Sequence, residues 1–135
     1  MPGMDATSGL ADLRRAEALA PKLLYAVDAR LEPSSPVTDI TELTAAAAAA
    51  VRAGDGHVLE TSHVTFPNGA VTLVLILAES HLSIHTWPEE SLIAIDLFSC
   101  GAIDGERVLA ELTGALHLEA ASITEVERGA PSAPR

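Results

Sequence analysis

Segments in which apolar and polar residues alternate recur along most of the chain, and they are typical of strands with one buried face. They predict strands over residues 22–31, 57–66, 70–78, 81–86, 91–98 and 120–127. Two segments are predicted to be helical instead. These are Thr41–Arg52, which contains an unbroken alanine run with maximal helix propensity, and Glu106–Leu116. The predicted order of elements is therefore β-α-β-β-β-β-α-β.

Residues typical of caps and turns separate these elements. Thr38-Asp39 can cap the first helix, and Gly54-Asp55-Gly56 ends it. Pro67-Asn68-Gly69 forms a turn between two of the predicted strands. Consecutive hairpins with two helices predict an α+β fold, namely a two-layer sandwich whose mainly antiparallel sheet is covered on one face by the two helices.

The length of 135 residues fits one domain, with enough core for independent folding. We expect residues 1–20 to form a mobile leader and residues 129–135 a disordered tail. Apolar residues make up 48% of the chain and aromatic residues only 3%, so we expect an aliphatic core.

The formal net charge of −11 argues against nucleic acid as a partner, because a phosphate backbone needs clustered lysine and arginine. An acidic surface keeps a protein soluble, and it also suits cationic small molecules. Glu42, Asp55 and Glu60 are interpreted as solvated surface in preference to cation sites.

The location is predicted from three features of the sequence. A single cysteine excludes an intramolecular disulfide, so nothing indicates an oxidising compartment. The first residues do not have the pattern of a signal peptide, and the longest apolar run, Leu73–Ala78, is too short to cross a bilayer. We therefore expect a cytoplasmic protein that has no membrane partner.

The segment that carries chemistry reads AESHLSIHTWPE at residues 78–89, and DLFSCG follows at residues 96–101. Glu79-Ser80 places a hydroxyl next to a backbone carbonyl, which is the arrangement that an N→O acyl shift needs. Attack of the Ser80 hydroxyl on the Glu79 carbonyl gives an ester, and β-elimination then releases Glu79 as a chain end. Residue 80 becomes dehydroalanine, which tautomerises and hydrolyses to a pyruvoyl group and ammonia. The expected products are fragments 1–79 and 80–135.

A pyruvoyl ketone can form a Schiff base with a substrate amine and accept electrons as carbon dioxide leaves, so no metal or nucleotide is needed. Three further residues have simpler interpretations when taken singly. Cys100 alone is more often buried packing, His85 is more often structural, and Thr72 is an ordinary strand residue. Their joint match to the signature of a known family changes that interpretation.

Ser80 precedes His85 by five positions and Cys100 by twenty. With these spacings the two segments resemble the small prokaryotic S-adenosylmethionine decarboxylases, and the resemblance extends over residues 57–129. It implies that His85 handles the proton during self-cleavage and that Thr72 assists. It also implies that Cys100 protonates the substrate α-carbon after decarboxylation, and that the chain forms a dimer.

The resemblance implies an amino-acid-type substrate, S-adenosylmethionine, which is decarboxylated to the aminopropyl donor for spermidine synthesis. Glu89 resembles a ligand of the ribose hydroxyls, and Phe66 and Trp87 are the aromatic candidates for contact with the adenine. The stretch that carries the adenine-stacking phenylalanine in the family has altered spacing here, at residues 63–68. A pyruvoyl-dependent arginine or ornithine decarboxylase is therefore a second hypothesis. A processing-dead regulatory paralogue is a third.

The predicted strands also indicate how the candidate residues are shared between chains. Five residues of extended strand span roughly 16 Å, so His85 cannot easily reach the Ser80 of its own chain. A hairpin folded near Glu79 brings Thr72 and His85 together across the ladder. The next hairpin brings Ser80 toward Cys100. We therefore predict a homodimer in which Cys100 serves its own chain, while Thr72 and His85 are delivered by the partner chain.

Overall fold

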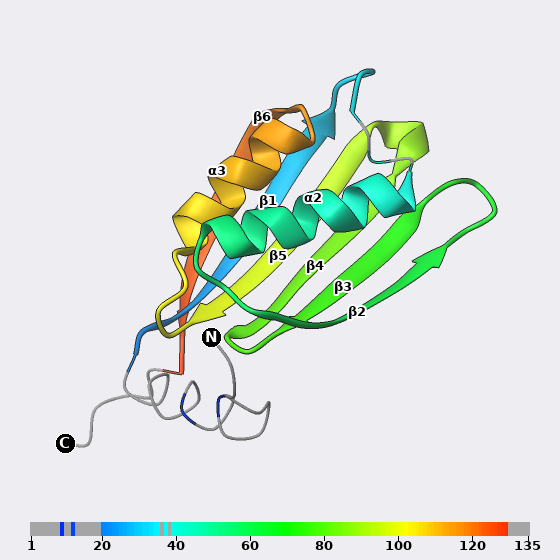
Figure 1. Cartoon of the computed structure of the whole chain (residues 1–135). Helices are drawn as coiled ribbons and strands as arrows, with labels where there is room; N and C mark the ends of the chain where they lie inside the picture. Colours follow the sequence, from blue (N-terminus) through cyan, green and yellow to red (C-terminus); the bar gives the residue numbers. More distant parts are fainter. Residues whose placement is uncertain (1–8, 10–11, 13–19, 36, 38, 130–135) are drawn as a thin grey trace.

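The computed structural model describes residues 9, 12, 20–35, 37 and 39–129. Most of the predicted leader and nearly all of the predicted tail lie outside these residues. The elements follow the predicted order, and their bounds differ from the predicted ones by no more than two residues (Figure 1). They are β1 (Lys22–Leu31), α2 (Ile40–Ala53), β2 (Val58–Thr65), β3 (Val71–Leu77), β4 (Ser80–Trp87), the short 3-10 helix η2 (Pro88–Glu90), β5 (Leu92–Cys100), α3 (Gly105–Ala115) and β6 (Leu118–Arg128).

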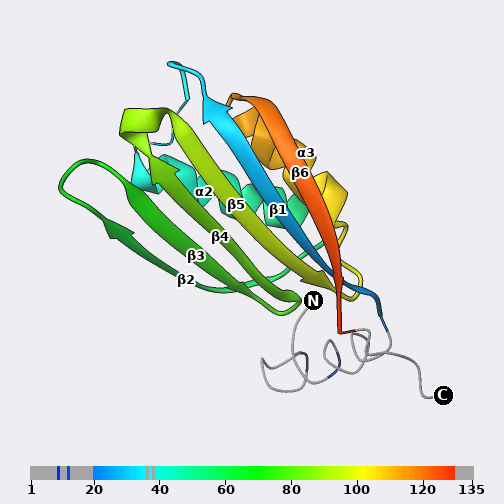
Figure 2. The same ribbon diagram turned by 180° about the vertical axis from the view of Figure 1, so that it is seen from behind.

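One sheet holds these six strands in the order β2-β3-β4-β5-β1-β6, and every pair of neighbours is antiparallel. Both α2 and α3 pack on the same face of the sheet (Figure 1). The opposite face, which we call the open face, is covered by neither of these helices (Figure 2). The predicted two-layer α+β sandwich is therefore confirmed.

Alternation along the strands decides which side chains enter the core. In β3, Leu73 and Leu75 are fully buried, and their partners across the ladder in β4, Ile84 and Leu82, are fully buried as well. The helices contribute further buried leucines to the same layer, among them Leu43 of α2 and Leu109 and Leu112 of α3. The aliphatic core that the composition predicts thus lies between the sheet and the two helices.

Helix α2 extends one residue beyond the predicted range at each end, and Asp39 and Gly54 cap it as the sequence predicts. The Asp39 carboxylate accepts hydrogen bonds from the backbone N–H groups of Thr41 and Glu42 at 2.9 and 3.2 Å. At the other end, a Cβ on Gly54 would lie 2.5 Å from Cγ2 of Val108, so glycine allows α2 and α3 to approach closely. In the described part of the chain no helix is both long and apolar enough to span a membrane.

The hairpin between β3 and β4 places strain at one residue. Leu77 pairs with Ser80, so only Ala78 and Glu79 lie in the turn. Ser80 has a φ of 140°, a value that residues with a side chain rarely adopt. A residue in such a conformation costs about 1–3 kcal/mol and persists only where the surrounding structure holds it. The strain falls on the residue that the sequence identifies as the nucleophile.

Removing the Cβ of residue 80 should release this strain. We expect Ser80→Gly to have a free energy of unfolding about 1 kcal/mol higher than that of Ser80→Ala, because glycine adopts a positive φ without a steric penalty. Both variants lack the hydroxyl, so they differ only in the Cβ. Urea denaturation measures the difference, and equal stabilities would mean that the turn holds no strain.

Candidate active site

Several polar side chains of the central strands lie on the open face of the sheet. Some residues of β3 and β4 alternate with residues that are buried against the helices, so their side chains point away from the helices. They are Thr72 in β3, and Ser83 and His85 in β4. Asp96 in β5 is the register partner of Ser83 and shares its face. The open face therefore combines hydroxyl, imidazole and carboxylate groups in the middle of the sheet.

Thr72 and His85 face each other in adjacent strands. They are register partners, and Oγ1 of Thr72 lies 3.4 Å from Nδ1 of His85, which is at the long end of hydrogen-bond distances. The ring of Trp87, two positions further along β4, has its centroid 6.4 Å from that of His85. The prediction that the ladder brings Thr72 and His85 together is confirmed. We call the part of the sheet around these two residues the histidine end.

A cavity with a volume of about 570 Å³ opens at the histidine end. Its lining includes Thr72 and His85, together with Phe66, Trp87 and Glu89. The last three are the residues that the sequence proposes for substrate binding. Residues that come from the β2–β3 turn, from β3, from β4 and from η2 thus meet around one space.

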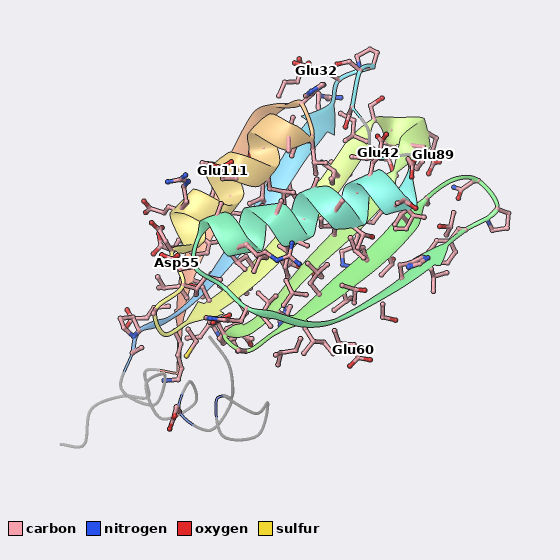
Figure 3. The ribbon with its side chains drawn as sticks, in the orientation of Figure 1. Glu32, Glu42, Asp55, Glu60, Glu89 and Glu111 are labelled. Atoms are coloured by element: carbon pink, nitrogen blue, oxygen red, sulfur yellow. The ribbon has the colours of Figure 1, made fainter. Side chains whose placement is uncertain are left out.

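Glu89 is exposed and lies in η2, at the same end of the molecule as Glu42 at the start of α2 (Figure 3). Its Oε2 accepts a hydrogen bond from Nδ2 of Asn68 at 3.2 Å. The Asn68 side chain also accepts a hydrogen bond from the backbone N–H of Ala70 at 3.1 Å, so the turn itself orients it. Asn68 was predicted only as a turn residue, and the structure adds the contact with Glu89.

Ser80 and Cys100 lie at the other end of the sheet, which we call the serine end. His81 pairs with Phe98, so Ser80 lies next to the last residues of β5. The Cys100 side chain is buried, and Ser80 is partly buried. The register of β4 and β5 thus places Ser80 beside the end of β5, which holds Ser99 and Cys100, as predicted.

The two ends are well separated within one chain. Because β4 is extended from Ser80 onward, His85 lies roughly 16 Å from Ser80 along the strand. Thr72, as the register partner of His85, lies at a similar distance. The chain thus gathers one set of candidate residues at each end, and it does not bring the two sets together.

Glu79 immediately precedes Ser80, and only 3% of its side chain is exposed. Its carboxylate is bound by His57, which lies just before β2. The His57 backbone N–H donates to Oε1 at 2.9 Å, and the ring Nδ1 lies 2.6 Å from Oε2. Sequence reasoning missed His57, because it lies 22 residues from Glu79 and no local pattern marks it.

The acidic residues Glu42, Asp55 and Glu60 are exposed. Glu42, Asp55 and Glu60 lie apart on different parts of the molecule (Figure 3), in agreement with their interpretation as solvated surface. Among the described residues, no three histidine, cysteine, aspartate or glutamate side chains form a group that could hold a metal ion.

On the helix side of the sheet, burial and the negative charges of acidic residues in β6 and at the start of α3 raise the pKa of Tyr25.

Known sequences extend the resemblance further toward the N-terminus. The family described as S-adenosylmethionine decarboxylase matches residues 24–129, a longer stretch than residues 57–129. An S-adenosylmethionine decarboxylase proenzyme from Thermotoga petrophila is 43% identical over 82 residues, which cover 60% of this chain and 62% of that relative. One from Pyrobaculum arsenaticum is 38% identical over 81 residues, which cover 58% of this chain and 59% of that relative. The chain therefore spans about three fifths of the length of these relatives.

The fold also has a solved counterpart. The crystal structure of the adenosylmethionine decarboxylase from Aquifex aeolicus is similar to this one, with a TM-score of 0.70 and 27% sequence identity. The similarity covers 86% of this chain and 97% of that one. The family match over most of the described residues, together with the shared fold, shows that this chain belongs to the S-adenosylmethionine decarboxylase family.

Proposed function

We propose that this chain is the precursor of a cytoplasmic, pyruvoyl-dependent S-adenosylmethionine decarboxylase that cleaves itself between Glu79 and Ser80. The observation that carries the proposal is the position of this peptide bond. It lies at the end of a two-residue hairpin turn, and Ser80 has a φ of 140°. Strain at the scissile bond favours the acyl shift, because the shift exchanges a strained peptide for an ester.

The cleavage needs no reactant other than water. Oγ of Ser80 attacks the carbonyl carbon of Glu79, the C–N bond breaks, and the amine of residue 80 is released as the ester forms. Loss of the Cα proton of residue 80 then expels the Glu79 carboxylate and leaves dehydroalanine. Tautomerisation and addition of one water release ammonia, so that fragment 80–135 begins with a ketone. Fragment 1–79 ends with Glu79.

The residues around position 80 fit a pyruvoyl group. The group would occupy the place of Ser80, at the start of β4 and next to the end of β5. It supplies an electrophilic carbonyl that engages the substrate α-amine and takes up the electron pair released with carbon dioxide. Cys100 is the candidate to return a proton to the substrate α-carbon. His85 and Thr72 are the candidates to move protons during the cleavage.

The cavity at the histidine end supports S-adenosylmethionine as the substrate. Phe66 and Trp87 offer aromatic faces to an adenine, and Glu89 offers a carboxylate that can accept hydrogen bonds from ribose hydroxyls. The family match and the names of the relatives point to the same substrate. The product would be an aminopropyl donor for spermidine synthesis.

A homodimer joins the two separated sets of residues. In the dimer that we propose, the open faces of two chains pack across a two-fold axis, so that the histidine end of each chain meets the serine end of the other. Apolar side chains on the open face support such contact: Val64 is 54% exposed, Ile76 44% and Val126 41%. Each complete site would then contain residues of both chains.

The first test is the mass of the purified protein under denaturing conditions. We expect two fragments, 1–79 and 80–135, of which the second reacts with a carbonyl reagent such as a hydrazine. Ser80→Ala, which lacks the attacking hydroxyl, should remain one chain. A wild-type chain that stays whole for days at neutral pH would contradict the proposal.

The cleaved protein then tests the substrate. Release of carbon dioxide should be seen with S-adenosylmethionine and not with arginine or ornithine. Because a hydrogen bond to a charged group contributes about 1.5–3 kcal/mol, Glu89→Ala should lower kcat/KM for S-adenosylmethionine by about 10–100-fold. Glu90→Ala is the matched control, since Glu90 is an exposed neighbour that does not line the cavity. An equal effect of both substitutions would argue against a binding role for Glu89.

A shared site predicts rescue between inactive chains. We expect His85→Ala to stay largely uncut alone, because no proton-handling group reaches its Ser80. When it is co-expressed with Ser80→Ala, each mixed dimer contains one intact site. The His85→Ala chain should then be cleaved, which mass spectrometry of differently tagged chains can detect.

The control for this experiment is the double variant. Ser80→Ala that also carries His85→Ala should form mixed dimers but should not restore cleavage. If mixed dimers form and the His85→Ala chain still remains whole, the shared site is contradicted.

A further inference from the structure

His57 holds both residues of the hairpin turn that precedes Ser80. Its carbonyl accepts the backbone N–H of Ala78 at 2.9 Å, and its own backbone N–H donates to Oε1 of Glu79 at 2.9 Å. The ring adds a third contact, because Nδ1 lies 2.6 Å from Oε2 of Glu79. The distance is that of a hydrogen bond between the imidazole and the carboxyl group. One residue therefore fixes the turn through its main chain and its side chain.

The burial of Glu79 makes this contact unusual for a turn. Two-residue hairpin turns favour glycine, asparagine and aspartate, because these residues tolerate the positive φ that such turns need. Glu79 instead turns its carboxylate inward until 3% of the side chain is exposed, whereas the side chain of His57 is 57% exposed. A buried carboxylate is unfavourable unless it is hydrogen-bonded, and both of its oxygens are bound by His57.

The clamp acts directly on the peptide group that is cut. The plane of the Glu79–Ser80 peptide is set by ψ of Glu79 on one side and by φ of Ser80 on the other. With its side chain and the preceding N–H held by His57, Glu79 has little freedom to rotate. The clamp therefore limits relaxation of the strained φ of Ser80 through rotation of the preceding residue, and it holds the orientation of the scissile carbonyl.

We propose that His57 is a positioning residue for self-cleavage, which acts by clamping the Glu79 side chain and thereby fixing the scissile carbonyl. This inference rests on the function proposed above. His57 and Glu79 both belong to fragment 1–79, so the cut does not divide the clamp. After the reaction, the contact between His57 and Glu79 also keeps the new C-terminus at Glu79 beside the start of β2.

The rate of cleavage in three variants tests the clamp. His57→Ala removes the ring contact, and we expect it to slow cleavage on the order of 100-fold, as for other small displacements of a reacting group. His57→Asn places an amide N–H near the position of Nδ1 and should keep most of the rate. His57→Gln carries the same amide further out, near the position of Nε2, and should be as slow as His57→Ala. His63→Ala, at an exposed histidine of β2, is the matched control and should cleave like the wild type.

The measurement is the mass of uncut protein over time after it is produced in a cell-free system. Each substitution is also made together with Ser80→Ala, and thermal unfolding of these uncut chains reports its effect on stability. Rescue by asparagine without rescue by glutamine, at similar stability, supports the clamp. It is overturned if His57→Ala is cut at the wild-type rate, or if all three variants are slowed equally while their unfolding temperatures fall together. An uncut wild-type chain would overturn the proposed cleavage and the clamp with it, whereas a cut wild type with an unaffected His57→Ala overturns the clamp alone.

Discussion

The register of the β3–β4 hairpin is the constraint on which the other features depend. It is fixed by burial, because a slip of one residue would turn Leu73, Leu75 and their partners in β4 out of the core. The same register sets Thr72 against His85 at one end of the ladder. At the other end it leaves only two residues for the turn, and Ser80 takes up a positive φ. Hydrophobic packing thus determines where the reactive groups lie.

The second organising feature is that the helices cover only one face of the sheet (Figures 1 and 2). The covered face carries the aliphatic core, so its side chains are mostly apolar. The open face is free to hold polar groups with partly exposed apolar neighbours, a composition suited to contact with another copy of the chain. In the proposed dimer, that contact would join the serine end of one chain to the histidine end of the other. The proposed active site is therefore complete only in the proposed dimer.

Local patterns in the sequence were sufficient to predict the elements. Lys22–Leu31 has the bounds of β1, and Asp39 and Gly54 end α2 as expected, because alternation and capping are properties of neighbouring residues. The pairing of Thr72 with His85 followed from the strand bounds and one turn. The contact of His57 with Glu79 could not be predicted in this way. It exists because the start of β2 lies beside the end of β3, and nothing within either segment indicates that a buried carboxylate needs a distant imidazole.

The strand order has a consequence for the cleaved protein. Strands β1, β2 and β3 belong to residues 1–79 and the other three to residues 80–135, and β1 lies between β5 and β6. If the chain is cut as proposed, neither fragment can leave without breaking ladders on both sides of a strand, so the two fragments would remain assembled through backbone hydrogen bonds. After cleavage, however, refolding from the unfolded state would require the two fragments to associate. The sheet of an uncut chain would form within one molecule, whereas separated fragments would first have to find each other in solution, so cleavage after folding favours correct assembly of the sheet.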